Sequence, residues 1–164
     1  MKKNKSILLI IFLLISTVGI SQQEEKLEKE YFENGQLASI GYTIDGSRTG
    51  EWKAYHENGQ LWIIGSFMDG EKTGEWKFYH KNGQLKSIGN YIDGKLNGER
   101  KVYHENGQLE SIGNYIDGIP NGEWKDYGIN GQLKTNGNFI DGKYRGKWKY
   151  YNEKGRVSRT VDYE

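Results

Sequence analysis

The sequence predicts an all-β protein, a single-layer, elongated and twisted antiparallel meander of tandem β-hairpin repeats. Two observations lead to this prediction. The pattern of residues recurs every 24 positions without insertion, and each 24-residue unit contains one Asn-Gly and one Asp-Gly pair. Both dipeptides favour tight hairpin turns, and the runs between them are rich in Ile, Tyr, Phe and Trp, as strands are.

The first 21 residues differ from the rest of the chain and predict a secretory signal peptide. Lys2, Lys3 and Lys5 precede an apolar or small run over residues 7–20, which is shorter than the roughly 20 residues that span a bilayer as a helix. We therefore expect an exported protein that is periplasmic, outer-envelope or secreted after cleavage near Ser21. An uncleaved anchor is the less favoured alternative. Residues 22–30 then form an N-terminal linker or edge.

Composition limits the partners. The chain contains no cysteine, so packing alone must stabilise the exported part. Its formal net charge is +1, which falls to about −2 without the three lysines of the signal segment. Such a mixed surface does not favour nucleic acid, and it gives no reason to expect membrane association beyond the signal segment.

The repeat frame is marked by a tyrosine at every 24th position, namely Tyr31, Tyr55, Tyr79, Tyr103, Tyr127 and Tyr151. Five repeats thus occupy residues 31–150, and residues 151–164 form a degenerate half-repeat that caps the array. Within a unit we expect one long strand, such as residues 84–92, and one short strand, such as residues 123–127. The single proline, Pro120, is expected in the turn between them.

Side-chain alternation along a strand indicates a single layer. In the third unit one side presents Leu85, Ser87, Gly89 and Tyr91, and the other presents Lys86, Ile88, Asn90 and Ile92. Both faces are therefore half apolar. A two-sheet sandwich would need one cleanly apolar face, so a single twisted meander is favoured.

The recurring elements Asn-Gly-Gln-Leu, Gly-Asn-Tyr, Asp-Gly and Gly-Glu-Trp-Lys, with a closing Tyr, resemble the variant form of the MORN repeat of bacterial proteins. The resemblance covers residues 31–164 and implies an elongated, curved array of hairpins that acts as an interaction scaffold. Related chains are often labelled antitoxins of the YwqK type, a role that fits poorly with an export signal. Two departures stand out: Arg100 occupies the Trp column, and Lys154-Gly155 replaces the last Asn-Gly.

Nothing in the sequence predicts catalysis, a cofactor or a metal. His56, His80 and His104 occupy one repeat column, so successive members lie about 9–10 Å apart and cannot readily share a metal ion. Each Asp-Gly turn offers one dependable carboxylate, whereas calcium needs six to eight oxygens. A repeated column also supplies none of the convergent, chemically different groups that an active site requires, so no enzyme is expected.

The aromatic columns are the stronger candidates for function. Trp52, Trp76, Trp124 and Trp148 recur with the repeat, and the favoured interpretation is a buried ladder that stabilises the sheet. A partly exposed ladder would instead contact a sugar or a protein. Trp62 breaks an otherwise mostly polar column, formed by Ala38, Lys86, Glu110 and Lys134. We therefore hypothesise a docking patch at Trp62 and Ile64, with the four ladder tryptophans as further candidates.

The predicted function is that of a non-enzymatic exported repeat scaffold that mediates protein–protein interaction. The alternative is a glycan- or cell-wall-binding module that uses the Tyr and Trp ladders. An antitoxin- or immunity-like protein is the third possibility. The sequence does not identify the partner, the binding face or the oligomeric state.

Overall fold

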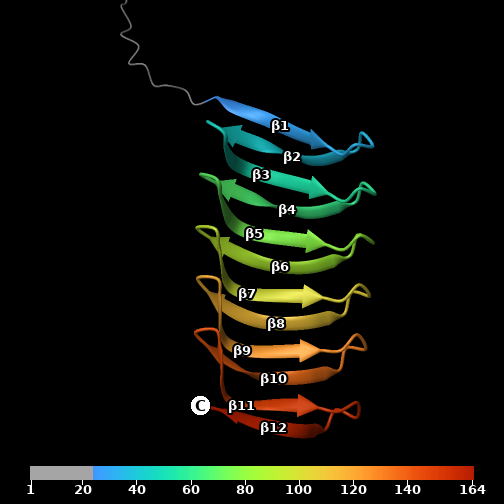
Figure 1. Cartoon of the computed structure of the whole chain (residues 1–164), viewed down its shortest axis with the longest axis vertical. Coiled ribbons are helices and arrows are strands. Elements are labelled where there is room, and N and C mark those ends of the chain that lie inside the picture. The colour runs from blue at the N-terminus through green and yellow to red at the C-terminus, as the bar shows by residue number, and fades with distance from the viewer. Residues whose placement is uncertain (1–23) are drawn as a thin grey trace, which may run out of the picture.

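The structure, a computed structural model, describes residues 24–164 as one open antiparallel sheet whose strands follow chain order (Figure 1). The predicted fold class is thereby confirmed, whereas the predicted signal peptide lies outside the described residues. No helix in the described part is long and apolar enough to cross a membrane. The twelve strands are β1 (Glu25–Tyr31), β2 (Leu37–Ile44), β3 (Ser47–Tyr55), β4 (Leu61–Met68), β5 (Glu71–Tyr79), β6 (Leu85–Ile92), β7 (Lys95–Tyr103), β8 (Leu109–Ile116), β9 (Ile119–Tyr127), β10 (Leu133–Ile140), β11 (Lys143–Tyr151) and β12 (Val157–Tyr163).

The Asp-Gly pairs form the two-residue turns that the sequence predicts. In the first of them, Asp45 has φ 50° and Gly46 has φ 80°, and the flanking residues Ile44 and Ser47 face each other in the ladder. Positive φ at both central residues is the signature of a type I′ turn, whose twist matches that of the flanking strands. The other four Asp-Gly pairs repeat this geometry.

The Asn-Gly pairs lie in longer loops, so the expectation of a tight turn there is wrong. In the second loop, which spans residues 56–60, the amide of His56 donates to the Gln60 carbonyl and the amide of Gly59 donates to the His56 carbonyl. The Asn58 side chain accepts from the Gln60 amide at 3.1 Å. Asn58 thus stabilises the loop through its side chain, in the manner of an Asx turn.

The two strands of each unit are nearly equal in length, which corrects the expected long and short pair. Strands such as β8 have eight residues and strands such as β9 have nine. The expected short strand at residues 123–127 begins instead at Ile119, directly after the Asp-Gly turn, and Pro120 lies inside it opposite Tyr115. The Asp117-Gly118 turn needs only two residues, so residues 119–122, which were expected in the turn, belong to the strand instead.

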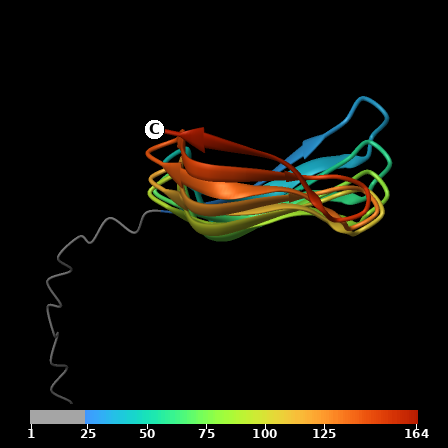
Figure 2. The same ribbon diagram turned by 90° about the horizontal axis from the view of Figure 1, so that it is seen from below.

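The sheet is bent rather than flat. In the end-on view the first and last strands lie to one side of the middle strands, so the array forms a shallow trough (Figure 2). Register shifts interrupt every strand pair, and bulges of this kind increase local twist.

The two faces differ in burial. The tryptophan face, which presents Trp52, Trp76, Trp124 and Trp148, contains the core. Trp76 and Trp148 are 1% and 2% exposed, and Ser39, Thr43 and Ser87 are buried on the same face. The opposite, ion-pair face presents four repeated pairs, Glu51–Lys53, Glu75–Lys77, Glu99–Lys101 and Glu123–Lys125. Both faces contain apolar residues, as expected, but only one of them is packed closely.

The edge strands depart from the repeat in the columns that form the core. In β1, Glu28 stands where interior units have tryptophan, and in β12 Val161 stands where they have glycine. Because the interior tryptophan lies against that glycine, neither end offers a copy of the interior packing. We therefore expect the ends to cap the array against continued stacking.

Candidate interaction surface

The tryptophan face is built from a Trp-over-Gly unit. A Cβ placed on Gly65 of β4 would lie 2.2 Å from the ring of Trp76 on β5, and the same close approach recurs between Gly41 and Trp52. The Trp76 Nε1 also donates to the Ser66 carbonyl at 3.2 Å. Only glycine leaves room for the indole to lie flat on the neighbouring strand.

The ladder tryptophans predicted as interaction residues lie largely in this core. Trp52, Trp76 and Trp148 are buried and Trp124 is half-buried. Their rings contact phenylalanine and tyrosine in edge-to-face geometry, with the Phe67 and Trp76 centroids 4.9 Å apart. This placement favours the buried-ladder interpretation over an exposed aromatic track.

Arg100 interrupts the ladder. Opposite it, Gly89 is approached by a methyl group of Leu96 rather than by an indole. The aromatic contacts consequently fall into two groups, one around Trp52 and Trp76 and one around Trp124 and Trp148.

Trp62 projects onto the tryptophan face because of a bulge. Ala54 pairs with Ile63 while the next residue, Tyr55, pairs with Leu61, which leaves Trp62 as the extra residue of β4. Its side chain is 47% exposed and its ring lies 6.1 Å from that of His56.

An aromatic hollow of about 360 Å³ opens beside Trp62. Trp52, Trp62, Ile63 and Phe67 contribute apolar lining. Ala54 also lines the hollow, at a position where the other units have the larger residues Phe78, Val102, Asp126 and Tyr150. The small side chain of Ala54 explains why the face is open here. Ile64, the predicted companion of Trp62, does not line this hollow.

Ile64 lies on the other face. It pairs with Lys53 and Lys77, both of which belong to the ion-pair face, while Ile63 lines the hollow. Successive residues of a strand point to opposite sides, so the predicted patch of Trp62 with Ile64 is replaced by Trp62 with Ile63. The bulge at Trp62 shifts the side-chain alternation, which a strict period of two cannot anticipate.

A second depression, of about 510 Å³, adjoins the hollow towards the Asn-Gly loops. Phe32, Tyr55 and Trp62 line both cavities, and His56 and Lys81 lie in the second one. The two cavities therefore meet around Trp62 and form one groove on the first two repeats. We call it the Trp62 groove.

Two cations lie over the aromatic residues of the groove. The Arg48 guanidinium carbon is 4.4 Å from the Trp52 ring centroid, and the Lys72 Nζ is 4.6 Å from that of Trp76. Both distances fit cation–π contact. Burial lowers the pKa of Lys72 from its ordinary value, because desolvation disfavours the ammonium form.

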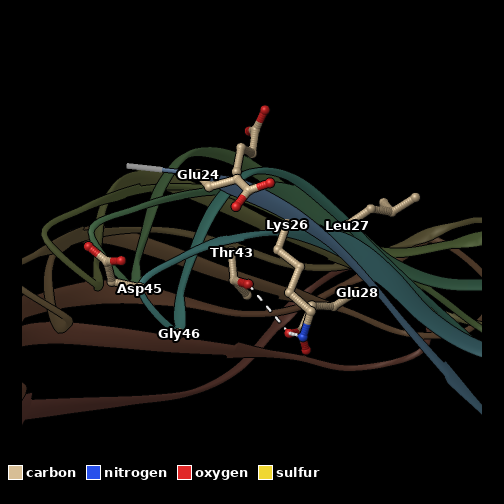
Figure 3. Close-up of a pocket in the computed structure, with 8 residues that line it drawn as sticks. Glu24, Lys26, Leu27, Glu28, Thr43, Asp45 and Gly46 are labelled. Carbon is tan, nitrogen blue, oxygen red and sulfur yellow. Dashed lines mark hydrogen bonds and ion pairs between the residues drawn. The ribbon is translucent and has the colours of Figure 1, made fainter. Parts of the chain in front are cut away.

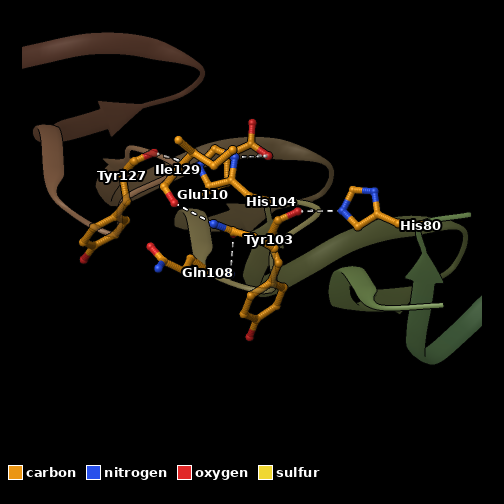
Figure 4. A network of polar contacts seen from close by, with 8 residues as sticks. His80, Tyr103, His104, Gln108, Glu110, Tyr127 and Ile129 are labelled. Atoms are coloured by element: carbon orange, nitrogen blue, oxygen red, sulfur yellow. Dashed lines mark hydrogen bonds and ion pairs between the residues drawn. The ribbon is translucent and has the colours of Figure 1, made fainter. Parts of the chain in front are cut away.

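The histidine column links successive Asn-Gly loops (Figure 4). His80 donates from Nε2 to the Tyr103 carbonyl at 2.8 Å, and His104 does the same to the Tyr127 carbonyl at 3.1 Å. A parallel set runs from the asparagines, for example from Asn82 to the Glu105 carbonyl at 2.9 Å. The column has a structural role, and the described residues contain no cluster of three or more His, Asp or Glu placed to hold a metal ion.

The depression at the β1 edge has a different character (Figure 3). It is lined by charged and polar groups, and Glu28 within it pairs with Lys26 at 2.9 Å and accepts from Thr43 at 3.5 Å. The hydrogen bond from Lys26 lowers the pKa of Glu28. Four carboxylates and one lysine line this depression, and Leu27 is its one large apolar residue, whereas aromatic side chains line the Trp62 groove, which is therefore the better candidate for a docking surface.

An apolar column on the ion-pair face was not anticipated from the sequence. It runs beside the Asp-Gly turns and consists of Met68, Ile92, Ile116 and Ile140, which are 50–58% exposed. The sequence contains a signal for this column, because each of its residues directly precedes an Asp-Gly pair. A position next to a turn does not by itself indicate an exposed apolar side chain. The four residues have similar exposures, so the column does not single out one position as a binding site.

Comparison with known proteins agrees with this architecture. The family model described as MORN repeat variant matches residues 24–45, 48–69, 72–93 and 96–117. Each matched segment contains one strand, an Asn-Gly loop and the following strand up to the Asp of the turn. The matched segments begin at 24-residue intervals, as the tyrosine frame does, but they start seven residues before each frame tyrosine. The strand pattern continues through β12 beyond the matched segments.

No curated protein matches the chain. Among solved structures, similarity is found to the crystal structure of a TarM mutant from S. aureus in complex with Fondaparinux, alpha-GlcNAc-glycerol and UDP. It has 13% sequence identity and a TM-score of 0.38, and it covers 58% of this chain and 19% of that protein. The chain thus spans about a fifth of that protein's length, and a likeness this low supports no conclusion about function. The four matched segments and the hairpin array together identify the chain as a member of the MORN repeat variant family.

Proposed function

We propose that this MORN repeat scaffold is non-enzymatic and binds a protein partner through the Trp62 groove on its tryptophan face. The observation behind the proposal is a large aromatic side chain, 47% exposed, next to an apolar hollow of about 360 Å³. Tryptophan is enriched among residues that dominate binding energy, and such residues favour pockets from which water is excluded. The predicted signal segment supports a role outside the cytoplasm.

Repeat columns supply matched variants for the test. Trp62→Lys introduces the residue that the next unit has at this position, Lys86, so the strand is expected to fold. Ile92→Ser removes an exposed apolar side chain on the opposite face and serves as control. The tagged full chain is cross-linked in its host cells, and the captured proteins are quantified by mass spectrometry.

A protein captured at stoichiometric level by wild type and Ile92→Ser, and lost at least tenfold with Trp62→Lys, supports the proposal. A partner that Trp62→Lys retains and Ile92→Ser loses would move binding to the ion-pair face. Capture of saccharide without any protein would favour the glycan-binding alternative instead.

A further inference from the structure

We propose that the Trp62 groove binds an extended acidic protein segment, which places one apolar side chain in the aromatic hollow and its carboxylates on Arg48 and Lys72. The inference rests on the proposed function and specifies the chemistry of the partner. Four features of the groove support it.

The first is charge. The ion pairs between residues 24 and 164 include the lysines of the ion-pair face, such as Lys53 with Glu51 at 2.6 Å, but neither Arg48 nor Lys72. Arg48 and Lys72 instead lie over aromatic rings. Lys72 is half-buried and Arg48 is exposed. A cation without a carboxylate partner gains from a charge-assisted hydrogen bond to an incoming anion, most of all where it is partly removed from water, as Lys72 is.

The second is the balance of acids nearby. Glu30 and Glu57 also line the groove. Glu30 already accepts a hydrogen bond from the Ser39 hydroxyl at 2.9 Å. Glu57 lines the depression near the Asn-Gly loops, which Lys81 also lines, and does not line the aromatic hollow that holds Arg48 and Lys72. The two unpaired cations are therefore available to carboxylates of a ligand.

The third is shape. Arg48 lines the groove at the start of β3, and His56 lines it directly after the end of β3. Eight residues of strand separate the two positions, a distance of roughly 25 Å. An extended segment of about seven or eight residues covers that distance. Trp62 stands between the two cavities, where a side chain from such a segment would contact its ring.

The fourth is polarity, which distinguishes a peptide from a sugar. Ile63 and Phe67 offer no hydrogen-bond partner to the hydroxyl groups of a saccharide, whereas they suit an aliphatic or aromatic side chain. Hydroxyls buried without hydrogen bonds oppose binding. An apolar side chain flanked by carboxylates matches both the walls and the cations.

This combination is restricted to the first two repeats. In later units the column of Arg48 and Lys72 continues as Leu96, Pro120 and Tyr144. Replacing either cation by leucine therefore copies Leu96, a residue that the array already accepts, so both variants are expected to fold.

The test uses the full chain and a fluorescent probe peptide, Asp-Glu-Asp-Phe-Asp-Glu-Asp, blocked at both ends. Two matched peptides replace the acids by Asn and Gln, or the Phe by Gly. Affinities are measured by fluorescence anisotropy at about 25 mM and 150 mM salt, because screening weakens exposed ion pairs. The variants are Arg48→Leu, Lys72→Leu and their double variant, with Ile92→Ser as control.

We expect the acidic Phe peptide to bind at least tenfold more tightly than either matched peptide. We also expect each single variant to lose severalfold affinity, the double variant at least tenfold, and Ile92→Ser none. Equal binding of the Asn/Gln peptide, unchanged affinity in the double variant, or no binding of the acidic peptide overturns the inference.

Failure of this inference is distinguishable from failure of the proposed function. A cellular partner that depends on Trp62 but tolerates the Arg48→Leu, Lys72→Leu double variant leaves the docking groove in place and refutes an acidic ligand. A partner that is indifferent to Trp62→Lys refutes the groove itself.

Discussion

We expect Gly65→Ala to destabilise the sheet strongly, because the glycine is the surface on which Trp76 lies. The added methyl carbon would stand 2.2 Å from Cδ2 and 2.4 Å from Cε2 of the indole, where carbon atoms normally approach to about 3.5–4.0 Å. Trp76 is 1% exposed and packs edge to face against Phe67, so its ring has little room to move.

The size of the effect can be bounded. If the ring adjusts in place, overpacking of this kind costs about 1–3 kcal/mol. If the ring is expelled, the loss of about 150–250 Å² of buried surface costs about 4–6 kcal/mol. The matched control is Gly89→Ala, in the same column but opposite Arg100. There the closest atom is a terminal methyl of Leu96, which can rotate away, so the control is expected to cost less than about 1 kcal/mol.

The assay is urea unfolding followed by circular dichroism, with Trp76→Ala added to complete a double-mutant cycle. Removing the indole removes the clash, so Gly65→Ala should cost little in the Trp76→Ala background, with a coupling of roughly 2 kcal/mol. Equal destabilisation by Gly65→Ala and Gly89→Ala, or strict additivity in the cycle, would refute the Trp-over-Gly packing as the basis of this core.

Three further outcomes are expected. Asn82→Ala removes the hydrogen bond from Asn82 to the next Asn-Gly loop, so it should lower the unfolding free energy by about 1 kcal/mol and speed amide exchange in that next loop. Among the described residues, Asn130 bonds only within its own loop, so Asn130→Ala should leave amide exchange in the neighbouring loop unchanged. Because burial lowers the pKa of Lys72 in the folded state, the unfolding free energy of wild type should rise relative to Lys72→Met as pH increases from 7 towards 10; a constant difference contradicts this. Glu28→Trp combined with Val161→Gly recreates the interior core columns at both ends and should give concentration-dependent assembly in light scattering; a monomeric double variant would contradict the capping role of the two ends.

The fold follows from local signals in the sequence. Five Asp-Gly pairs specify type I′ turns at 24-residue intervals, and an array without insertions leaves little choice but a meander in chain order. The Asn-Gly loops and the length of the second strand could not be predicted as well. The same dipeptide serves a two-residue turn or a five-residue loop, and the surrounding hydrogen bonds decide between them. Proline is common in turns, which is why Pro120 is predicted there, but it lies inside β9.

The candidate site was predictable only in part. Trp62 stands out because it breaks a column, and its exposure agrees with that signal. Its neighbours were assigned from simple alternation, so the bulge that brings it beside Ile63 rather than Ile64 was missed. Ala54 gives no signal of its own in the sequence. Its importance depends on the larger residues that occupy its column in other units.

A nearly identical repeat presents the same surface many times, so a unique site has to arise where the copies differ. The five Asp-Gly turns are constant, and the Trp-over-Gly units and the loop ladders recur in most units; all of them stabilise the array. Three differences surround the groove. Ala54 stands in a column whose other members, Phe78, Val102, Asp126 and Tyr150, are all larger, and Trp62 stands in a mostly polar column. Arg48 and Lys72 are cations where leucine, proline and tyrosine follow. Because these departures converge on one groove, the variation between repeats, more than the repeat itself, is where partner specificity is expected to reside.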